Sequence, residues 1–238
     1  LETAIENYQQ AVQINPNHTA AYHNMGIALE NKGDLVAAID SYQQALKIMP
    51  DYADSYFNMG LALQEKGDSE AAIESYKEGL KIKPDYAEAY YNMGNSLKAK
   101  GDIEAAADSF KKAINIKPDF AEAYYNMGNV LKEKGDLEAA IESYKQALKI
   151  KPDFAEAYNN MGNALKDKGA LEAAADSFKK AINIKPDFAE AYYNMGNVLK
   201  EKGDLEAAID SYKQALEIKP DYAEAWNNLI FPLQAMKL

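Results

Sequence analysis

The prolines of this 238-residue chain recur at a constant spacing of 34 residues. Seven of the eight keep it, namely Pro16, Pro50, Pro84, Pro118, Pro152, Pro186 and Pro220. Two sets of glycines, one starting at Gly26 and the other at Gly33, repeat with the same period. A fixed period of this length indicates an array of stacked repeats, in which each unit packs on its neighbours.

Aligning these residues divides the chain into six full units and two partial ones. The full units are 19–52, 53–86, 87–120, 121–154, 155–188 and 189–222. Residues 1–18 correspond to a second helix without its first, and 223–238 to a partial repeat or a terminal cap. We expect a single array over 1–238, with Pro232 kinking or ending the last helix.

Each unit is typical of two amphipathic helices joined by a tight turn. In 121–154 the apolar residues recur at helical spacing, first as Tyr124, Met127, Gly128 and Leu131, then as Leu137, Ala140, Ile141, Tyr144, Ala147 and Leu148. Asp119 and Asp136 are placed to cap the two helices, and Gly135 to stop the first in a left-handed conformation. Two units depart from this pattern: Gly79 replaces the usual Ala, at a cost of about 1 kcal/mol, and Ala170 replaces the capping Asp.

This helix–turn–helix pattern resembles the tetratricopeptide repeat (TPR) family over essentially the whole chain. The residues that carry the resemblance in one unit are Tyr124, Met127, Gly128, Leu131, Ala140, Tyr144, Ala147 and Pro152. The resemblance implies an all-α, right-handed superhelical solenoid of antiparallel helix pairs. It also implies a concave groove lined by the first helices, which in this family generally binds peptides or proteins.

The composition argues against several other functions. The net charge is -11 and every basic residue is Lys, which disfavours nucleic acids and membranes as partners. There is no Cys, and the two histidines, His18 and His23, are expected at the surface without catalytic or metal-binding partners. We therefore expect no enzymatic activity, no cofactor and no metal site. No apolar run is long enough to span a membrane and no signal peptide is evident, so the predicted location is cytoplasmic.

Asparagines form the most regular polar pattern on the predicted groove side of the first helices. The first row has one member in each unit: Asn24, Asn58, Asn92, Asn126, Asn160, Asn194 and Asn228. The second row, one turn along, is Asn95, Asn129, Asn163 and Asn197. Tyrosines Tyr91, Tyr125 and Tyr193 and lysines Lys98, Lys132, Lys166 and Lys200 share this side. A carboxamide has two donors and one acceptor, so an exposed row could pair with the N–H and C=O groups of an extended peptide.

Other interpretations stay open at this point. The amides could bond only to neighbouring repeats or to water, and the lysines could form a solvated ion-pair edge beside Glu133, Asp167 and Glu201. The Asn row resembles that of the repeat region of O-GlcNAc transferases, which would imply binding of substrate polypeptide. The alternative interpretation is a structural or oligomerisation segment of a larger protein, such as one with a transferase domain, whose ends associate with those of another copy. Carboxylate-clamp chaperone binding is disfavoured, because Glu88 and Glu122 stand where that subgroup has cations.

Overall fold

The computed structural model describes the backbone of residues 1–235 and the side chains of residues 1–230. This part of the chain forms fourteen α-helices and no strand. They are α1 (Glu2–Ile14), α2 (Thr19–Lys32), α3 (Leu35–Ile48), α4 (Ala53–Glu65), α5 (Ser69–Ile82), α6 (Ala87–Ala99), α7 (Ile103–Ile116), α8 (Ala121–Glu133), α9 (Leu137–Ile150), α10 (Ala155–Asp167), α11 (Leu171–Ile184), α12 (Ala189–Glu201), α13 (Leu205–Ile218) and α14 (Ala223–Ala235). The even-numbered helices are the first helices of the repeats, and the odd-numbered ones are the second helices.

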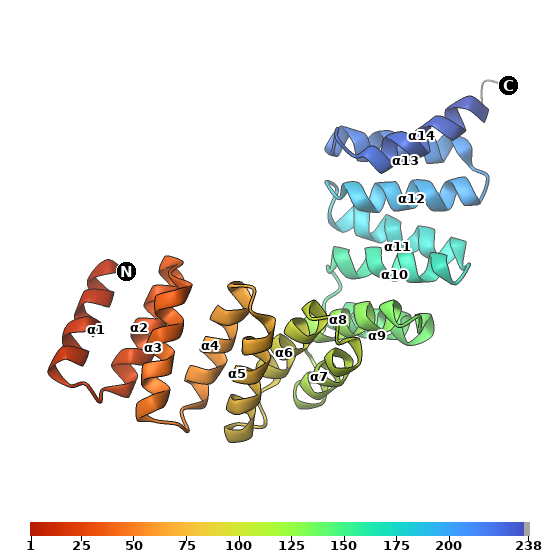
Figure 1. Cartoon of the computed structure of the whole chain (residues 1–238). Coiled ribbons are helices and arrows are strands. Elements are labelled where there is room, and N and C mark those ends of the chain that lie inside the picture. Colours follow the sequence, from red (N-terminus) through yellow and green to blue (C-terminus); the bar gives the residue numbers. More distant parts are fainter. Residues whose placement is uncertain (236–238) are drawn as a thin grey trace. The chain divides into compact units, whose positions relative to one another are not determined.

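The chain divides into two compact units, unit 1 from Leu1 to Pro118 and unit 2 from Asp119 onward. Within each unit every helix packs on the next one along the chain (Figure 1). First helices of successive repeats also contact each other, as α2 does α4 and α10 does α12, whereas successive second helices within a unit do not. The first helices therefore adjoin along one side of each unit, which we call the inner side. The predicted all-α class, built from stacked helix pairs, is confirmed.

The second helices begin with the predicted aspartate caps. Oδ1 of Asp136 accepts a hydrogen bond from the backbone N–H of Ala139 at 3.1 Å. Ala170 stands at the same place before α11, and no side chain caps that helix. The prediction for Asp119 is wrong: α8 begins after Phe120, which has φ -89° and ψ 84° and makes no side-chain cap. Gly135 adopts φ 84°, the left-handed conformation predicted for the end of α8.

Glycines let the two helices of a repeat approach closely. The fully buried ring of Tyr144 fills the space beside Gly128, where an added β-carbon would lie 2.6 Å from Cε1 of the tyrosine. Tyr42, Phe178 and Tyr212 are placed in the same way against their own glycines. Any side chain at these glycines would overpack the core.

The last helix does not end at Pro232, one of the two outcomes expected there, because α14 continues to Ala235. The remaining three residues of the expected partial unit 223–238 lie outside the described range. Among the described helices, none is long and apolar enough to cross a membrane.

Candidate functional site

The first-row asparagines lie on the inner side of both units, but they are less accessible than a solvent-facing row would be. Only Asn24 is exposed; most members are half-buried, and Asn194 is 8% exposed. The expectation of an exposed row is therefore wrong for most of its length. The contacts of these carboxamides decide what they can do.

In unit 2, Asn160 on α10 is bonded to the preceding repeat. Its Nδ2 donates to the Tyr125 hydroxyl at 2.9 Å and to Oδ1 of Asn129 at 2.9 Å. The Tyr144 hydroxyl donates to the same Asn129 oxygen at 2.8 Å. Two helices of one repeat are thus joined to the first helix of the next by a connected set of polar side chains, which we call the amide relay.

The amide relay recurs at the other end of unit 2. Nδ2 of Asn228 donates to the Tyr193 hydroxyl at 3.0 Å and to Oδ1 of Asn197 at 2.9 Å. The Tyr212 hydroxyl donates to that Asn197 oxygen at 2.9 Å. The same chemistry at two places in the unit shows that these residue types at these spacings produce the relay.

The repeat between them has a variant of this arrangement. Asn159 replaces the tyrosine found at Tyr125 and Tyr193, and its Oδ1 accepts from Nδ2 of Asn194 at 3.0 Å. Phe178 replaces the hydroxyl-bearing ring, so it offers no donor to Asn163. The side chain of Asn163 is half-buried and makes no hydrogen bond within the described chain.

The first two full repeats of unit 1 lack the residues from which the relay is built, whereas its third repeat has Tyr91 and Asn95 at the places of Tyr125 and Asn129. Asn58 follows a repeat with His23 and Ile27 at the places of Tyr125 and Asn129, and Asn92 follows a repeat with Phe57 and Leu61 there. Within the part of the chain that the structure describes, the carboxamides of Asn24, Asn58 and Asn92 form no hydrogen bond. The second-helix tyrosines bond elsewhere: the Tyr42 hydroxyl donates to Oε2 of Glu30 at 2.8 Å, and that of Tyr76 to Oε1 of Gln64 at 3.3 Å.

His23 is not the surface histidine that we expected from the sequence. It is buried between α2 and α4, with Nδ1 2.8 Å from Oγ of Ser55 and its ring beside those of Tyr42 and Tyr52. Burial lowers the pKa of His23, and the Asp54 carboxylate acts in the opposite direction. This histidine therefore has a packing and hydrogen-bonding role at a junction between repeats.

The three inner-side tyrosines, which stand on first helices, pack against neighbouring aromatic rings. Tyr125 lies 4.8 Å from the Phe154 ring and 6.1 Å from Tyr144, and Tyr193 lies 5.0 Å from Tyr222, measured between ring centroids. Tyr91 lies 6.0 Å from Phe110. Burial raises the pKa of Tyr125, which keeps its hydroxyl protonated. Much of the flat area expected to contact a ligand is therefore covered by the protein itself.

In unit 2 the lysine row forms part of the expected ion-pair edge, through Asp167. Nζ of Lys132 is 3.5 Å from Oδ2 of Asp167, and Nζ of Lys166 is 4.0 Å from Oδ1 of the same residue. Lys200 donates to Oδ1 of Asn228 at 3.4 Å. Lys98 in unit 1 is half-buried. Pairs of this exposure contribute little to stability.

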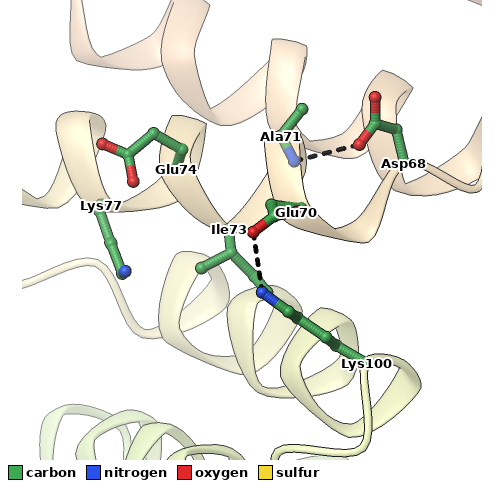
Figure 2. A pocket seen from close by; sticks show the side chains of 7 residues that line it. All are labelled: Asp68, Glu70, Ala71, Ile73, Glu74, Lys77 and Lys100. Atoms are coloured by element: carbon green, nitrogen blue, oxygen red, sulfur yellow. Dashed lines mark hydrogen bonds and ion pairs between the residues drawn. The ribbon is translucent and has the colours of Figure 1, made fainter.

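The structure also has a hollow of about 380 Å³ away from the asparagine rows (Figure 2). It lies where the first turns of α5 meet the end of α6, lined by Asp68, Glu70, Ala71, Ile73, Glu74, Lys77 and Lys100. Figure 2 shows two polar contacts there: Asp68 caps the Ala71 N–H, and Lys100 donates to Glu70 at 2.9 Å. Glu70, Lys100 and Asp68 are already engaged in these contacts within the protein, so the inner side is the stronger candidate.

Sequence reasoning placed the amides on one side but missed their partners. A signal for the partners exists in the sequence: each relay amide has a tyrosine 35 residues before it and an asparagine 31 residues before it. Asn58 and Asn92 lack both. Recognising that signal requires knowing which side chains of successive first helices meet, and the repeat period alone does not give this.

Comparison with known proteins identifies the repeat. A family model described as TPR repeat matches the chain seven times in succession, at residues 1–33, 31–67, 65–101, 94–135, 128–169, 162–203 and 196–229. No protein among those with curated descriptions matches.

Several solved structures are similar. MamA has 33% sequence identity and a TM-score of 0.67, over 70% of this chain and 97% of that chain. YrrB, a TPR protein with an unusual peptide-binding site, has 27% identity and a TM-score of 0.67, over 83% of this chain and 98% of that chain. The similarity to PilF of Pseudomonas aeruginosa, with 19% identity and a TM-score of 0.73 over 88% of this chain and 95% of that chain, is one of fold alone.

Proposed function

Because the chain belongs to the tetratricopeptide-repeat family, we propose that it is a non-catalytic scaffold that binds an extended polypeptide along its inner side. The observation that supports this most is the first asparagine row: within each unit consecutive first helices adjoin, and each presents one carboxamide on that side. An amide offers hydrogen bonds that a peptide main chain can use whatever its sequence.

Two further observations support a peptide as the ligand. YrrB, which is similar in sequence and structure, is itself a TPR protein with a peptide-binding site. The net charge of -11 and the absence of arginine disfavour nucleic acid. Tyr91, Tyr125 and Tyr193 would add partly exposed aromatic surface, and the lysine row would border the bound segment.

The test is selection of ligands from a random dodecapeptide library displayed on phage, with the full chain immobilised. We expect enriched peptides whose synthetic forms bind the chain in fluorescence anisotropy titrations. The comparison variant replaces Asn58, Asn92 and Asn160 by Ala and should bind the same peptides more weakly. If no peptide is enriched over an uncoated surface, or if the triple variant binds equally well, the proposed function is wrong.

A further inference from the structure

We propose that the two units use their first-row asparagines differently: Asn58 and Asn92 of unit 1 contact the polypeptide, and those of unit 2 hold neighbouring repeats together. This inference rests on the proposed function, because it assigns the residues of the same inner side that would meet the ligand. It divides what the sequence presents as one uniform row into two parts.

The amides of unit 2 have little hydrogen-bonding capacity left. Both protons of Asn160 are donated, to Tyr125 and Asn129, and its oxygen accepts from Nδ2 of Asn159 at 3.3 Å. Asn228 also donates twice, and its oxygen accepts from Lys200 at 3.4 Å. Asn194 donates to Asn159 and is 8% exposed. A peptide could bond to these groups only by breaking bonds within the protein.

The amides of unit 1 are in the opposite situation. Asn58 and Asn92 are half-buried, and among the described residues neither side chain has a hydrogen-bond partner. No fully buried side-chain polar atom in that part of the chain is left unsatisfied, so water reaches these carboxamides. Each can therefore exchange water for a peptide N–H and C=O without disturbing the fold.

In the first two full repeats of unit 1, an apolar residue holds the place that Asn129 holds in the relay. Leu61 has the same position relative to Asn92 as Asn129 has relative to Asn160, and it is 36% exposed. Ile27 has that position relative to Asn58 and is half-buried. An apolar side chain of a bound peptide can cover these residues while its main chain bonds to the amides, a combination that the polar neighbours in unit 2 do not offer.

The charges of unit 1 define the ligand further. The carboxylates of Glu30 and Glu65 interact electrostatically, and within the described chain no lysine forms an ion pair with either. The lysine place of later repeats is occupied here by Glu30 and Gln64. The ligand that fits this surface is an extended peptide with an apolar side chain and a nearby Lys or Arg.

The experiment uses the dodecapeptide most enriched by the full chain, labelled with fluorescein, and two matched double variants. N58A/N92A should weaken binding roughly tenfold or more, the effect of losing two hydrogen-bonding groups, and should leave the melting temperature nearly unchanged. N160A/N228A should bind within about twofold of the parent chain and melt at a lower temperature. The reverse pattern would overturn the inference.

Two further measurements keep the inference testable even if one of the double variants fails to fold. In the unmutated ¹⁵N-labelled chain, the peptide should shift the side-chain NH₂ signals of Asn58 and Asn92 and not those of Asn160 and Asn228. The variant L61N should supply Asn92 with an acceptor like that of Asn129, which would weaken peptide binding. Shifts confined to the unit 2 amides would refute this inference but would leave the proposed function standing. Failure to enrich any peptide would refute the proposed function itself.

Discussion

The ring of Phe57 occupies the space that a β-carbon on Gly79 would need, since that carbon would lie 2.5 Å from Cε1 of the ring. Phe57 is 4% exposed and stands at the place of Tyr125 in a later repeat. The glycine that appears from the sequence to be a weak point in α5 therefore has a structural role. It admits a buried aromatic ring between the two helices of its repeat.

Replacing Gly79 by Ala should lower the free energy of unfolding by about 1 kcal/mol, although alanine is the better helix former. The overpacking of Phe57 outweighs the gain in helix propensity. In a Phe57→Ala background the same substitution should be neutral or stabilising, because the ring is gone. Urea unfolding of the four chains in this double-mutant cycle measures the coupling, and a stabilising G79A in the unmutated chain would contradict the explanation.

Replacing Asn160 by Ala should cost about 1–2 kcal/mol, because it removes two hydrogen bonds and leaves Tyr125 and Asn129 without that donor. Asn58→Ala is the matched control at the same place in a repeat without the relay. It should change stability by no more than about 0.5 kcal/mol. Equal effects of the two substitutions on urea unfolding would show that the relay contributes nothing.

The stability of unit 1 should fall as the pH is lowered below the ordinary His pKa of 6.5. Burial lowers the pKa of His23 in the folded chain, so the unfolded chain takes up a proton first, and protonation favours unfolding. Above that pH both states hold the neutral ring and the contribution is constant. Urea midpoints between pH 7.5 and 5.5 should therefore decrease more steeply than in a chain without this histidine.

The control is the double variant H23F/S55A, which replaces the buried His–Ser pair by residues found at the same places in later repeats, Phe57 and Ala89. Asp54, which interacts with His23 electrostatically, is retained. If the pH dependence of parent and control is identical, His23 does not cause it.

Replacing Ala170 by Asp should stabilise the chain by about 1 kcal/mol. The backbone of Ala170, at φ -85° and ψ 66°, is close to that of Asp136, at φ -82° and ψ 76°, so a carboxylate can reach the N–H groups of α11 without rearrangement. Ala170→Asn, a neutral capping residue, separates the hydrogen bond from the charge. An unchanged melting temperature in both variants would argue against the cap.

Ile230 sets a steric condition on the end-to-end association that the sequence suggests. It stands at the place of Gly26 and Gly128, and α1 has Tyr8 at the place of Tyr42. A β-carbon at Gly26 would lie 2.5 Å from the Tyr42 ring, so α1 of a second copy cannot dock on α14 in the geometry used within a repeat. The variant I230G should therefore associate more strongly than the parent chain in sedimentation velocity, and Y8A/I230G should lose that gain.

The helices were predictable because each depends on residues near it in sequence. Gly135 and Asp136 fix a helix end and the next helix start wherever they occur, and the apolar spacing fixes which side is buried. The prediction for Asp119 fails because the chain enters α8 one residue later, through Phe120, so an aromatic residue holds the cap position.

The roles of the asparagines were not predictable in the same way, because they depend on residues a whole repeat away. Asn58 and Asn160 are identical in type and place, and they differ only in what precedes them by 31 and 35 residues. The burial of His23 escapes prediction for the same reason, since its partner Ser55 belongs to the following repeat. The position of a side chain on its own helix determines which way it faces. Whether it is free to bind a ligand depends on the residues of the adjoining helix.

The amide relay also limits how far the modules of this chain can be shuffled. A repeat that begins with an amide such as Asn160 needs a predecessor that supplies a phenol and a carboxamide oxygen, as Tyr125 and Asn129 do. Inserted behind the repeat of Phe57 and Leu61, it would meet two hydrocarbon side chains, and its donors would have only solvent to bond. Neighbouring repeats are therefore complementary in their polar side chains, and exchanging their order would leave hydrogen-bonding groups without protein partners.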